Sequence, residues 1–267
     1  MLTFVIAIFV VLFGLAFGSF LNVCIARLPQ HASIVRPGSR CPRCGAAIRA
    51  LDNLPLVSWA VLRGRCRSCR WRIPWRYPAV EFATATLFLL SYLRFGLSLF
   101  GIGMDVLCFL LLGLAVMDAE TLRLPDAFTL PGIALGVVYA GLFPAATVGA
   151  HAENAIAAAL WAGLAALLIL IIRWIYYFAR REEGMGIGDA KLLAMIAAWL
   201  GPSLTLLTLV IGVVAAAMLG MVMIAVGPRR GAGGKARMPF GAFLCAAAIY
   251  AIFAGQPIVD WYAGFFR

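Results

Sequence analysis

Long apolar segments constrain this chain more than any other feature of its sequence. Hydrophobic residues make up 64% of the 267 residues, and charged residues only 12%. A run of roughly 17–25 apolar residues is long enough to cross the hydrocarbon layer of a membrane as a helix. The sequence therefore predicts an all-α, polytopic integral membrane protein. About eight transmembrane helices are expected, at residues 3–25, 79–95, 99–117, 127–144, 155–178, 189–202, 204–226 and 239–256.

Two CxxC pairs lie in a polar insert between the first two of these segments. Cys41 and Cys44 form one pair, Cys66 and Cys69 form the other, and 21 residues separate the pairs. Two thiolates from each of two turns complete the tetrahedral shell of a zinc ion. Four thiolates leave no open coordination position for chemistry, so we expect a structural Zn²⁺. Two disulfides or a thioredoxin-like redox motif are the alternatives, and they need an oxidising compartment or a βαβ context.

The distribution of arginine predicts how the chain crosses the membrane. The net charge is +11, and eleven arginines lie between Arg27 and Arg76, where Asp52 is the only acidic residue. With the N-terminus outside, the arginine-containing loops fall on one side, as the positive-inside rule requires. The insert then faces the cytoplasm, where thiols stay reduced. Arginines gathered there suit anionic membrane lipid or an acidic partner, and we expect no nucleic-acid partner.

Two carboxylates stand at the cytoplasmic ends of predicted membrane helices. Asp118 ends the segment 99–117, and Asp189 follows glycines at 184, 186 and 188. A carboxylate at membrane depth is costly, which makes it a candidate functional residue. Two carboxylates held close together cannot both ionise, so a pair offers a base that activates water and an acid that protonates the leaving amine. The pattern favours peptide-bond hydrolysis of the aspartic type.

Other roles stay open on spacing alone, because 71 residues separate Asp118 from Asp189. Asp118 is also typical of a topological charge at a helix end, and Asp189 of a helix N-cap. Asp126 follows a proline and precedes an apolar segment, so capping is its better interpretation. A proton-coupled carrier would use the first two as relay groups. A non-catalytic zinc-bearing assembly factor would need neither.

Further motifs extend over nearly the whole chain. They are residues 18–23 with 27–29, the two CxxC pairs with 52–59, residues 76–81, residues 118–126, the glycine run into Asp189 and Lys191, and residues 238–241. Together they resemble the bacterial type IV prepilin leader peptidases and N-methyltransferases, which serve pilus and type II secretion systems. The resemblance implies a bifunctional enzyme of the bacterial inner membrane, with prepilins and pseudopilins as substrates.

The resemblance also implies roles for individual residues. The catalytic aspartates are Asp118, which begins a D-x6-PD pattern, and Asp189 of a GxGD motif. They would remove the basic leader peptide at the cytoplasmic membrane face. The new N-terminal amine would then be methylated with S-adenosylmethionine. The implied domains are a first transmembrane helix (1–26), a double-CxxC zinc domain associated with methyl transfer (27–78) and a transmembrane aspartic peptidase domain (79–267).

Spacing does not identify the residues that bind S-adenosylmethionine, and it is the resemblance that implies the insert and its rims. On that ground we expect this role for Asn22, Arg27, Gly64 and Glu81. Each has a simpler structural interpretation: a hydrogen bond between helices for Asn22, a topology anchor for Arg27, a turn for Gly64 and an ion pair with an arginine for Glu81. The nearest alternative function is a peptidase without methyl transfer. The intact double CxxC favours both activities.

Overall fold

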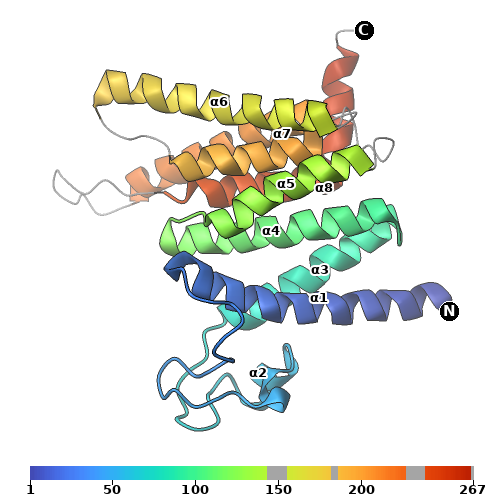
Figure 1. The fold of residues 1–267 in the computed structure, drawn as a ribbon, viewed down its shortest axis with the longest axis vertical. Coiled ribbons are helices and arrows are strands. Elements are labelled where there is room, and N and C mark those ends of the chain that lie inside the picture. Colours follow the sequence, from blue (N-terminus) through green and yellow to red (C-terminus); the bar gives the residue numbers. More distant parts are fainter. Residues whose placement is uncertain (143–154, 182–185, 227–237, 266–267) are drawn as a thin grey trace. The chain divides into compact units, whose positions relative to one another are not determined.

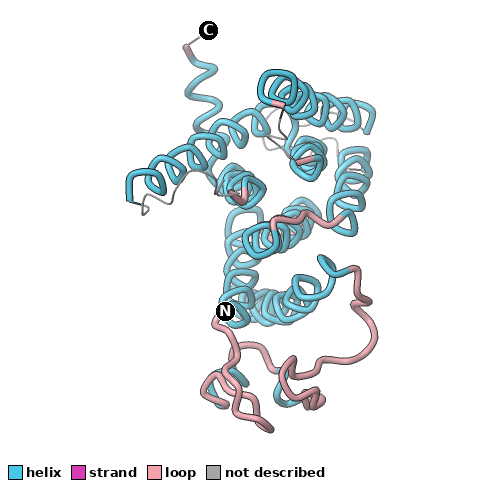
Figure 2. Tube along the Cα trace, turned by 90° about the vertical axis from the view of Figure 1, so that its left-hand side faces the viewer, coloured by secondary structure: helices cyan, strands magenta, loops and turns pink. Residues whose placement is uncertain are grey.

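The structure is a computed structural model that describes residues 1–142, 155–181, 186–226 and 238–265. Within these ranges the regular elements are helices, apart from isolated antiparallel bridges in the insert (Figure 2). The all-α prediction is confirmed. The α-helices are α1 (Leu2–Arg27), α2 (Val57–Val61), α3 (Arg76–Phe95), α4 (Leu99–Thr121), α5 (Asp126–Leu142), α6 (Ala155–Arg180), α7 (Ile187–Val226) and α8 (Phe240–Gly264). Two short 3-10 helices are η1 (Leu28–Gln30) and η2 (Ala50–Asn53).

Five of the described helices are long and apolar enough to cross a membrane: α1, α4, α6, α7 and α8. The shorter α5 is also apolar. The predicted segment 79–95 forms most of α3, whose charged residues Glu81 and Arg94 lower its hydropathy. Several apolar helices therefore suit a multi-pass membrane protein, and the number that span stays a prediction. Residues 143 and 144 of the predicted segment 127–144, and the glycine at 184, lie outside the described residues.

The break predicted between residues 202 and 204 occurs inside α7. Gly201 has a φ of 70°, a left-handed conformation that favours glycine, and Pro202 follows it. Leu209, beyond the break, packs against a cluster formed by Ile169 of α6 and Leu193 of the first half of α7, among others. Both halves of α7 therefore contribute to the same core, as two separate segments would.

The chain forms two compact units, Met1–Gly113 and Leu114–Arg267. In the first unit α1 and α3 pack along one another (Figure 1). Their backbones approach closely at two glycines: a Cβ atom added at Gly14 would lie 2.7 Å from Cα of Ala85, and one at Gly18 would lie 2.6 Å from Cα of Glu81. Larger side chains would push the helices apart, so these glycines fix the position of Glu81 relative to α1.

The second unit is a bundle in which α7 packs against α5, α6 and α8. Its core is apolar and contains buried residues of α7 from Leu192 to Leu200. Trp199 donates its indole N–H to the carbonyl of Gly132 at 2.8 Å and stacks on Tyr139, which joins α7 to α5. This packing fixes the helix whose first turn carries Asp189. Cys24 and Cys108 in the first unit and Cys245 in the second are buried in helices, as expected of apolar packing residues.

Candidate functional site

Asp118 lies near the end of α4, and the first turn of α8 holds its carboxylate. The side chain is 5% exposed. Its Oδ2 accepts a hydrogen bond from the backbone N–H of Ala242 at 2.9 Å. Gly241, the preceding residue, leaves room for this contact, because a Cβ there would lie 3.0 Å from the same oxygen. The N–H groups at a helix start have no partner within the helix and carry partial positive charge, so they suit a carboxylate.

Asp189 lies in the first turn of α7, and its carboxylate is also held by a backbone amide. The N–H of Gly186 donates to Oδ2 of Asp189 at 3.0 Å. The charge of Asp118 acts on the carboxyl group of Asp189. Both charges also act on the buried thiol of Cys245 in α8. The structure thus brings together the two aspartates that the sequence separates by 71 residues, and it fixes one oxygen of each.

An exposed ion pair lies beside this pair of aspartates in sequence. Nζ of Lys191, two residues beyond Asp189, is 2.6 Å from Oδ1 of Asp126 at the start of α5. Asp126 does begin a helix, as the capping interpretation requires, but its recorded partner is the lysine rather than a backbone N–H. The ion pair joins the start of α5 to the start of α7.

The four cysteines of the insert converge on one point. The sulfur atoms of Cys41, Cys44, Cys66 and Cys69 all lie within 4.8 Å of one another, and all four are free thiols. The sulfurs of Cys41 and Cys69 are 3.8 Å apart, far beyond the length of a disulfide bond. Four Zn–S bonds of about 2.3 Å in a tetrahedron place the sulfurs about 3.8 Å apart. The donor set and its spacing therefore fit a tetrathiolate metal site.

Both cysteine pairs are built on the same turn. The N–H of Cys41 donates to the carbonyl of Ala46 at 2.9 Å, and the N–H of Cys66 donates to the carbonyl of Trp71 at 2.8 Å. The residue after each pair is left-handed: Gly45 has a φ of 70°, and Arg70 has a φ of 57°. Repeating this turn directs four sulfurs to one centre.

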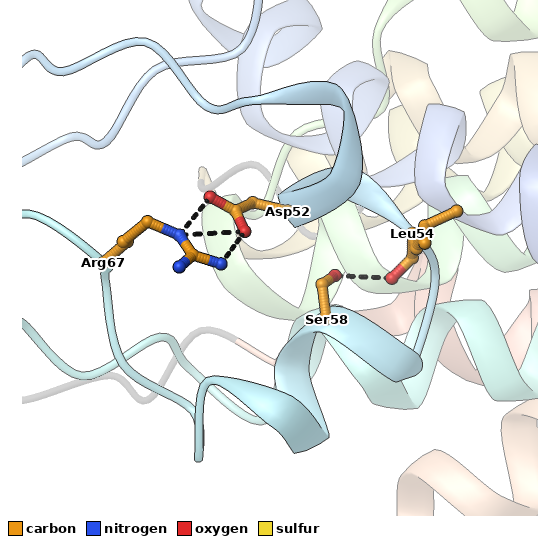
Figure 3. A network of polar contacts seen from close by, with 4 residues as sticks. All are labelled: Asp52, Leu54, Ser58 and Arg67. Carbon is orange, nitrogen blue, oxygen red and sulfur yellow. Dashed lines mark hydrogen bonds and ion pairs between the residues drawn. The ribbon is translucent and has the colours of Figure 1, made fainter.

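A bidentate ion pair closes the insert between η2 and the second CxxC pair. Nε of Arg67 is 2.8 Å from Oδ2 of Asp52, and Nη2 is 2.6 Å from Oδ1 (Figure 3). The Arg67 guanidinium holds the pKa of the Asp52 carboxyl below its usual value. In the same view the hydroxyl of Ser58 donates to the carbonyl of Leu54 at the start of α2. The segment 52–59 is thereby held to the second CxxC pair.

A cavity of about 330 Å³ lies between the insert and the ends of α1 and α3. Small-molecule sites typically start at about 300 Å³. Three aromatic side chains line it, Trp59, Trp71 and Tyr77. Arginines also line it, on the side of the insert; they include Arg40, Arg49 and Arg67. Aromatic faces and guanidinium groups in one cavity suit a ligand with a flat ring and an anionic group.

Three of the four residues expected at a cofactor line this cavity: Asn22, Arg27 and Glu81. Nδ2 of Asn22 in α1 donates to the carbonyl of Tyr77 in α3 at 3.0 Å. Asn22 therefore makes a hydrogen bond between helices, as its simpler structural interpretation predicts. Arg27 holds the chain before the first CxxC pair: Nη1 donates to the carbonyl of Ser33 at 2.9 Å, and Nη2 to that of Pro37 at 2.7 Å. Its recorded hydrogen bonds are therefore structural.

Gly64 lies outside the lining of the cavity and shapes it through a neighbour. It has a φ of 63°, and a Cβ there would lie 3.0 Å from the ring of Trp59. The turn interpretation of Gly64 therefore agrees with the structure. Sequence reasoning did not assign Trp59, Trp71 and Tyr77 to the cavity. The available signal was the presence of several large aromatic residues in an insert too small to need them all for its core.

Comparisons with known proteins match both units. Residues 12–95 match the family described as the bacterial peptidase A24 N-terminal domain, and residues 105–221 match the type IV leader peptidase family. A protein of Pseudomonas aeruginosa is 35% identical over 96% of this chain and 92% of its own length. A protein of Pseudomonas putida is 35% identical over 92% and 89%, and one of Myxococcus xanthus is 38% identical over 84% and 65%. All three are named prepilin leader peptidase/N-methyltransferase. No solved structure matches the chain.

Proposed function

The chain belongs to the type IV leader peptidase family, and we propose that it cleaves the leader peptide from type IV prepilins and pseudopilins and then methylates the new N-terminus. It is an enzyme with two activities, as the names of its relatives indicate. The observation that carries the peptidase assignment is the convergence of Asp118 and Asp189 within one compact unit, each held by a backbone N–H.

Asp118 and Asp189 act together on the scissile peptide bond. One carboxylate takes a proton from water, which then attacks the carbonyl carbon, and the other carboxyl protonates the departing amine. The N–H groups of Ala242 and Gly186 each hold one carboxylate oxygen and so fix the orientation of the two aspartates. The pair lies at the ends of apolar helices, where the substrate's basic leader gives way to its hydrophobic helix.

Replacing each aspartate by asparagine tests this assignment. Asparagine keeps the size of the side chain and its hydrogen bond to the backbone amide but cannot exchange a proton. We expect Asp118→Asn and Asp189→Asn to abolish cleavage of a model prepilin while the purified proteins retain bound zinc. Asp260→Asn, in an exposed part of α8, is the matched control and should cleave normally. Full cleavage by either active-site variant would remove that residue from the mechanism.

Methyl transfer is assigned to the cavity beside the insert. S-adenosylmethionine supplies an electrophilic methyl group, and the residues present fit it. Trp59, Trp71 and Tyr77 offer flat faces for an adenine ring, and the arginines of the insert offer donors for a carboxylate. Calorimetric titration with S-adenosylhomocysteine tests the site, and Trp59→Ala should weaken binding at least about tenfold if the ring stacks there.

The four cysteines support a structural zinc ion. Their sulfur spacing fits a closed tetrahedral shell, so Cys41, Cys44, Cys66 and Cys69 would hold the ion. The insert has few other means of staying folded, since none of the residues in η2 and α2 is buried. The metal would therefore stabilise the wall of the cavity rather than take part in either reaction.

The arrangement of charge supports a location in the bacterial inner membrane. The N-terminus would lie outside, with the insert and both aspartates at the cytoplasmic face. Arginines of the insert would then lie near anionic lipid, consistent with a membrane partner and no nucleic acid. Labelling single cysteines introduced in the insert of intact cells with a membrane-impermeant thiol reagent tests the orientation; labelling without permeabilisation would reverse it.

A further inference from the structure

Two buried side chains that carry hydrogen-bond acceptors line the cavity beside the insert. They come from the neighbouring helices α1 and α3. Asn22 of α1 is 3% exposed and Glu81 of α3 is 8% exposed. Both line the cavity of about 330 Å³. Asn22 lies five residues before the end of α1 at Arg27, and Glu81 lies five residues after the start of α3 at Arg76. Five residues of helix span about 7.5 Å, so both groups lie just inside the helix ends that face the insert.

The amide oxygen of Asn22 is short of a partner. Its Nδ2 donates to the carbonyl of Tyr77 at 3.0 Å, and this bond fixes which way the amide points. Oδ1 is then left buried without a hydrogen bond among the described residues. Buried acceptors without a donor are rare in folded proteins, so the orphaned oxygen of a residue that lines a cavity indicates a ligand with a donor to offer.

The carboxylate of Glu81, which lines the same cavity, can accept further hydrogen bonds. Its Oε2 accepts the N–H of Leu56 at 2.8 Å, and the hydroxyl of Ser19 also donates to the carboxylate. Both donors are uncharged, and a carboxylate has about four acceptor positions. Leu56 adopts a φ of 58°, unusual for leucine, so the insert is held against this carboxylate at some conformational cost. Glu81 therefore contributes negative charge and free lone pairs to the cavity that Asn22 also lines.

An acceptor pair of this kind selects a primary ammonium group. An ammonium carries positive charge and three N–H donors, enough for Glu81 and Asn22 together. A sulfonium has no N–H donor and leaves the oxygen of Asn22 unpaired. Two ammonium groups are available under the function proposed above: the new N-terminus of the cleaved substrate and the amino group of the methyl donor itself. The position of the pair favours the first, because a substrate whose mature N-terminus opens a hydrophobic helix presents that terminus at the membrane interface.

We propose that Glu81 and Asn22 form the acceptor-amine site of the methyl transfer. This rests on the proposed function of the cavity. Asn22 Oδ1 and the Glu81 carboxylate bind the α-ammonium group of the cleaved substrate, and Glu81 takes one of its protons. The neutral amine nitrogen then forms a bond to the methyl carbon, while the carbon–sulfur bond breaks with its electron pair kept by sulfur. The product is a methylated secondary ammonium, and Glu81 returns its proton to solvent.

Two variants of the full-length protein in detergent test this proposal. Glu81→Gln keeps an oxygen for the N–H of Leu56 and loses the charge and the base. Asn22→Leu removes the orphaned acceptor. With a pre-cleaved pilin peptide as substrate, we expect Glu81→Gln to lower kcat/KM about 100-fold near pH 7. Its residual rate should rise roughly 15–25-fold between pH 6.5 and 8.5, as the free amine loses its proton with a pKa of about 7.7–8.0. Asn22→Leu should mainly raise KM for the peptide.

Binding of S-adenosylhomocysteine, measured by calorimetry, separates the two sources of ammonium. This ligand carries the amino group of the methyl donor, so unchanged affinity in both variants supports the peptide amine as the ligand. Lost affinity with an unchanged KM for the peptide would assign the pair to the methyl donor and overturn the proposal. A normal rate and pH profile in Glu81→Gln would overturn it as well. Wild-type protein that neither binds S-adenosylhomocysteine nor methylates would instead overturn the proposed function of the cavity. Asp260→Asn is the matched control for loss of a carboxylate.

Discussion

Asp118 and Ala242 are joined by a 2.9 Å hydrogen bond from a backbone N–H to Oδ2, although 124 residues separate them along the chain. The bond seats one carboxylate of the aspartate pair on the first turn of α8. The N-terminal amides of a helix can hold an anion without a cationic side chain. The position of this turn therefore decides where the carboxylate of Asp118 points.

A methyl group at Gly241 should impair cleavage. Its Cβ would lie 3.0 Å from Oδ2 of Asp118 and 3.0 Å from Cδ1 of Leu124, so one of these groups must shift. We expect Gly241→Ala to slow cleavage of a model prepilin about 10–100-fold, the effect of displacing a catalytic group by about 1 Å. Gly163→Ala is the control, because a Cβ there meets nothing within 4 Å. Equal cleavage rates in the two variants would show that Asp118 does not depend on α8.

A methyl group at Gly18 should impair methyl transfer and spare cleavage. Its Cβ would lie 2.6 Å from Cα of Glu81, a backbone atom that cannot move without separating α1 from α3. Overpacking of this kind costs about 1–3 kcal/mol. We expect Gly18→Ala to reduce methylation of a pre-cleaved peptide at least about tenfold, a change that about 1.4 kcal/mol accounts for. Cleavage should stay within threefold of wild type. A larger loss of cleavage than of methylation would contradict the assignment of the two activities to different units.

Loss of one zinc thiolate should unfold the insert before it affects the rest of the chain. We expect Cys66→Ser to lower bound zinc, measured by elemental mass spectrometry, and to open the segment 39–73 to protease. Methylation should fall to background while cleavage by the aspartates is partly retained. Cys108→Ala, a buried cysteine of α4, is the control and should retain the wild-type zinc content. A Cys66→Ser protein that keeps its full zinc content and a protease-resistant insert would show that the four-thiolate site does not hold the insert folded.

The ion pair between Lys191 and Asp126 should contribute little to stability. Its side chains are 31% and 59% exposed, and exposed pairs of this kind are worth about 0.2–1 kcal/mol. A double-mutant cycle with Lys191→Met and Asp126→Asn, followed by thermal unfolding in detergent, should give a coupling energy below about 1 kcal/mol. A coupling of several kcal/mol would mean that the start of α5 and the start of α7 depend on this contact for their positions.

Local patterns in the sequence predicted much of this structure because the features concerned are themselves local. Apolar runs located the long helices, and the break at Gly201 fell where two segments were expected to part. The spacing of Cys41 with Cys44, and of Cys66 with Cys69, was enough to predict a four-sulfur site.

Contacts between distant parts of the chain were beyond such patterns. Spacing could not show that Asp118 and Asp189 meet, or that Ala242 would hold one of them. The same limit applies to the cavity, whose walls come from α1, the insert and α3. Gly64 illustrates the difference: the resemblance suggested a cofactor contact, which stays a prediction, and the structure adds its φ of 63° and its close approach to the ring of Trp59.

The most direct measurement is mass spectrometry of a model prepilin incubated with the purified protein and S-adenosylmethionine in detergent. We predict loss of the leader peptide and, on the new N-terminus, a gain of one methyl group in place of one hydrogen. Asp118→Asn and Asp189→Asn should show neither change with the intact prepilin, yet both should methylate a pre-cleaved peptide. If several different prepilins all stay intact after incubation with the wild-type protein, the proposed peptidase activity is contradicted.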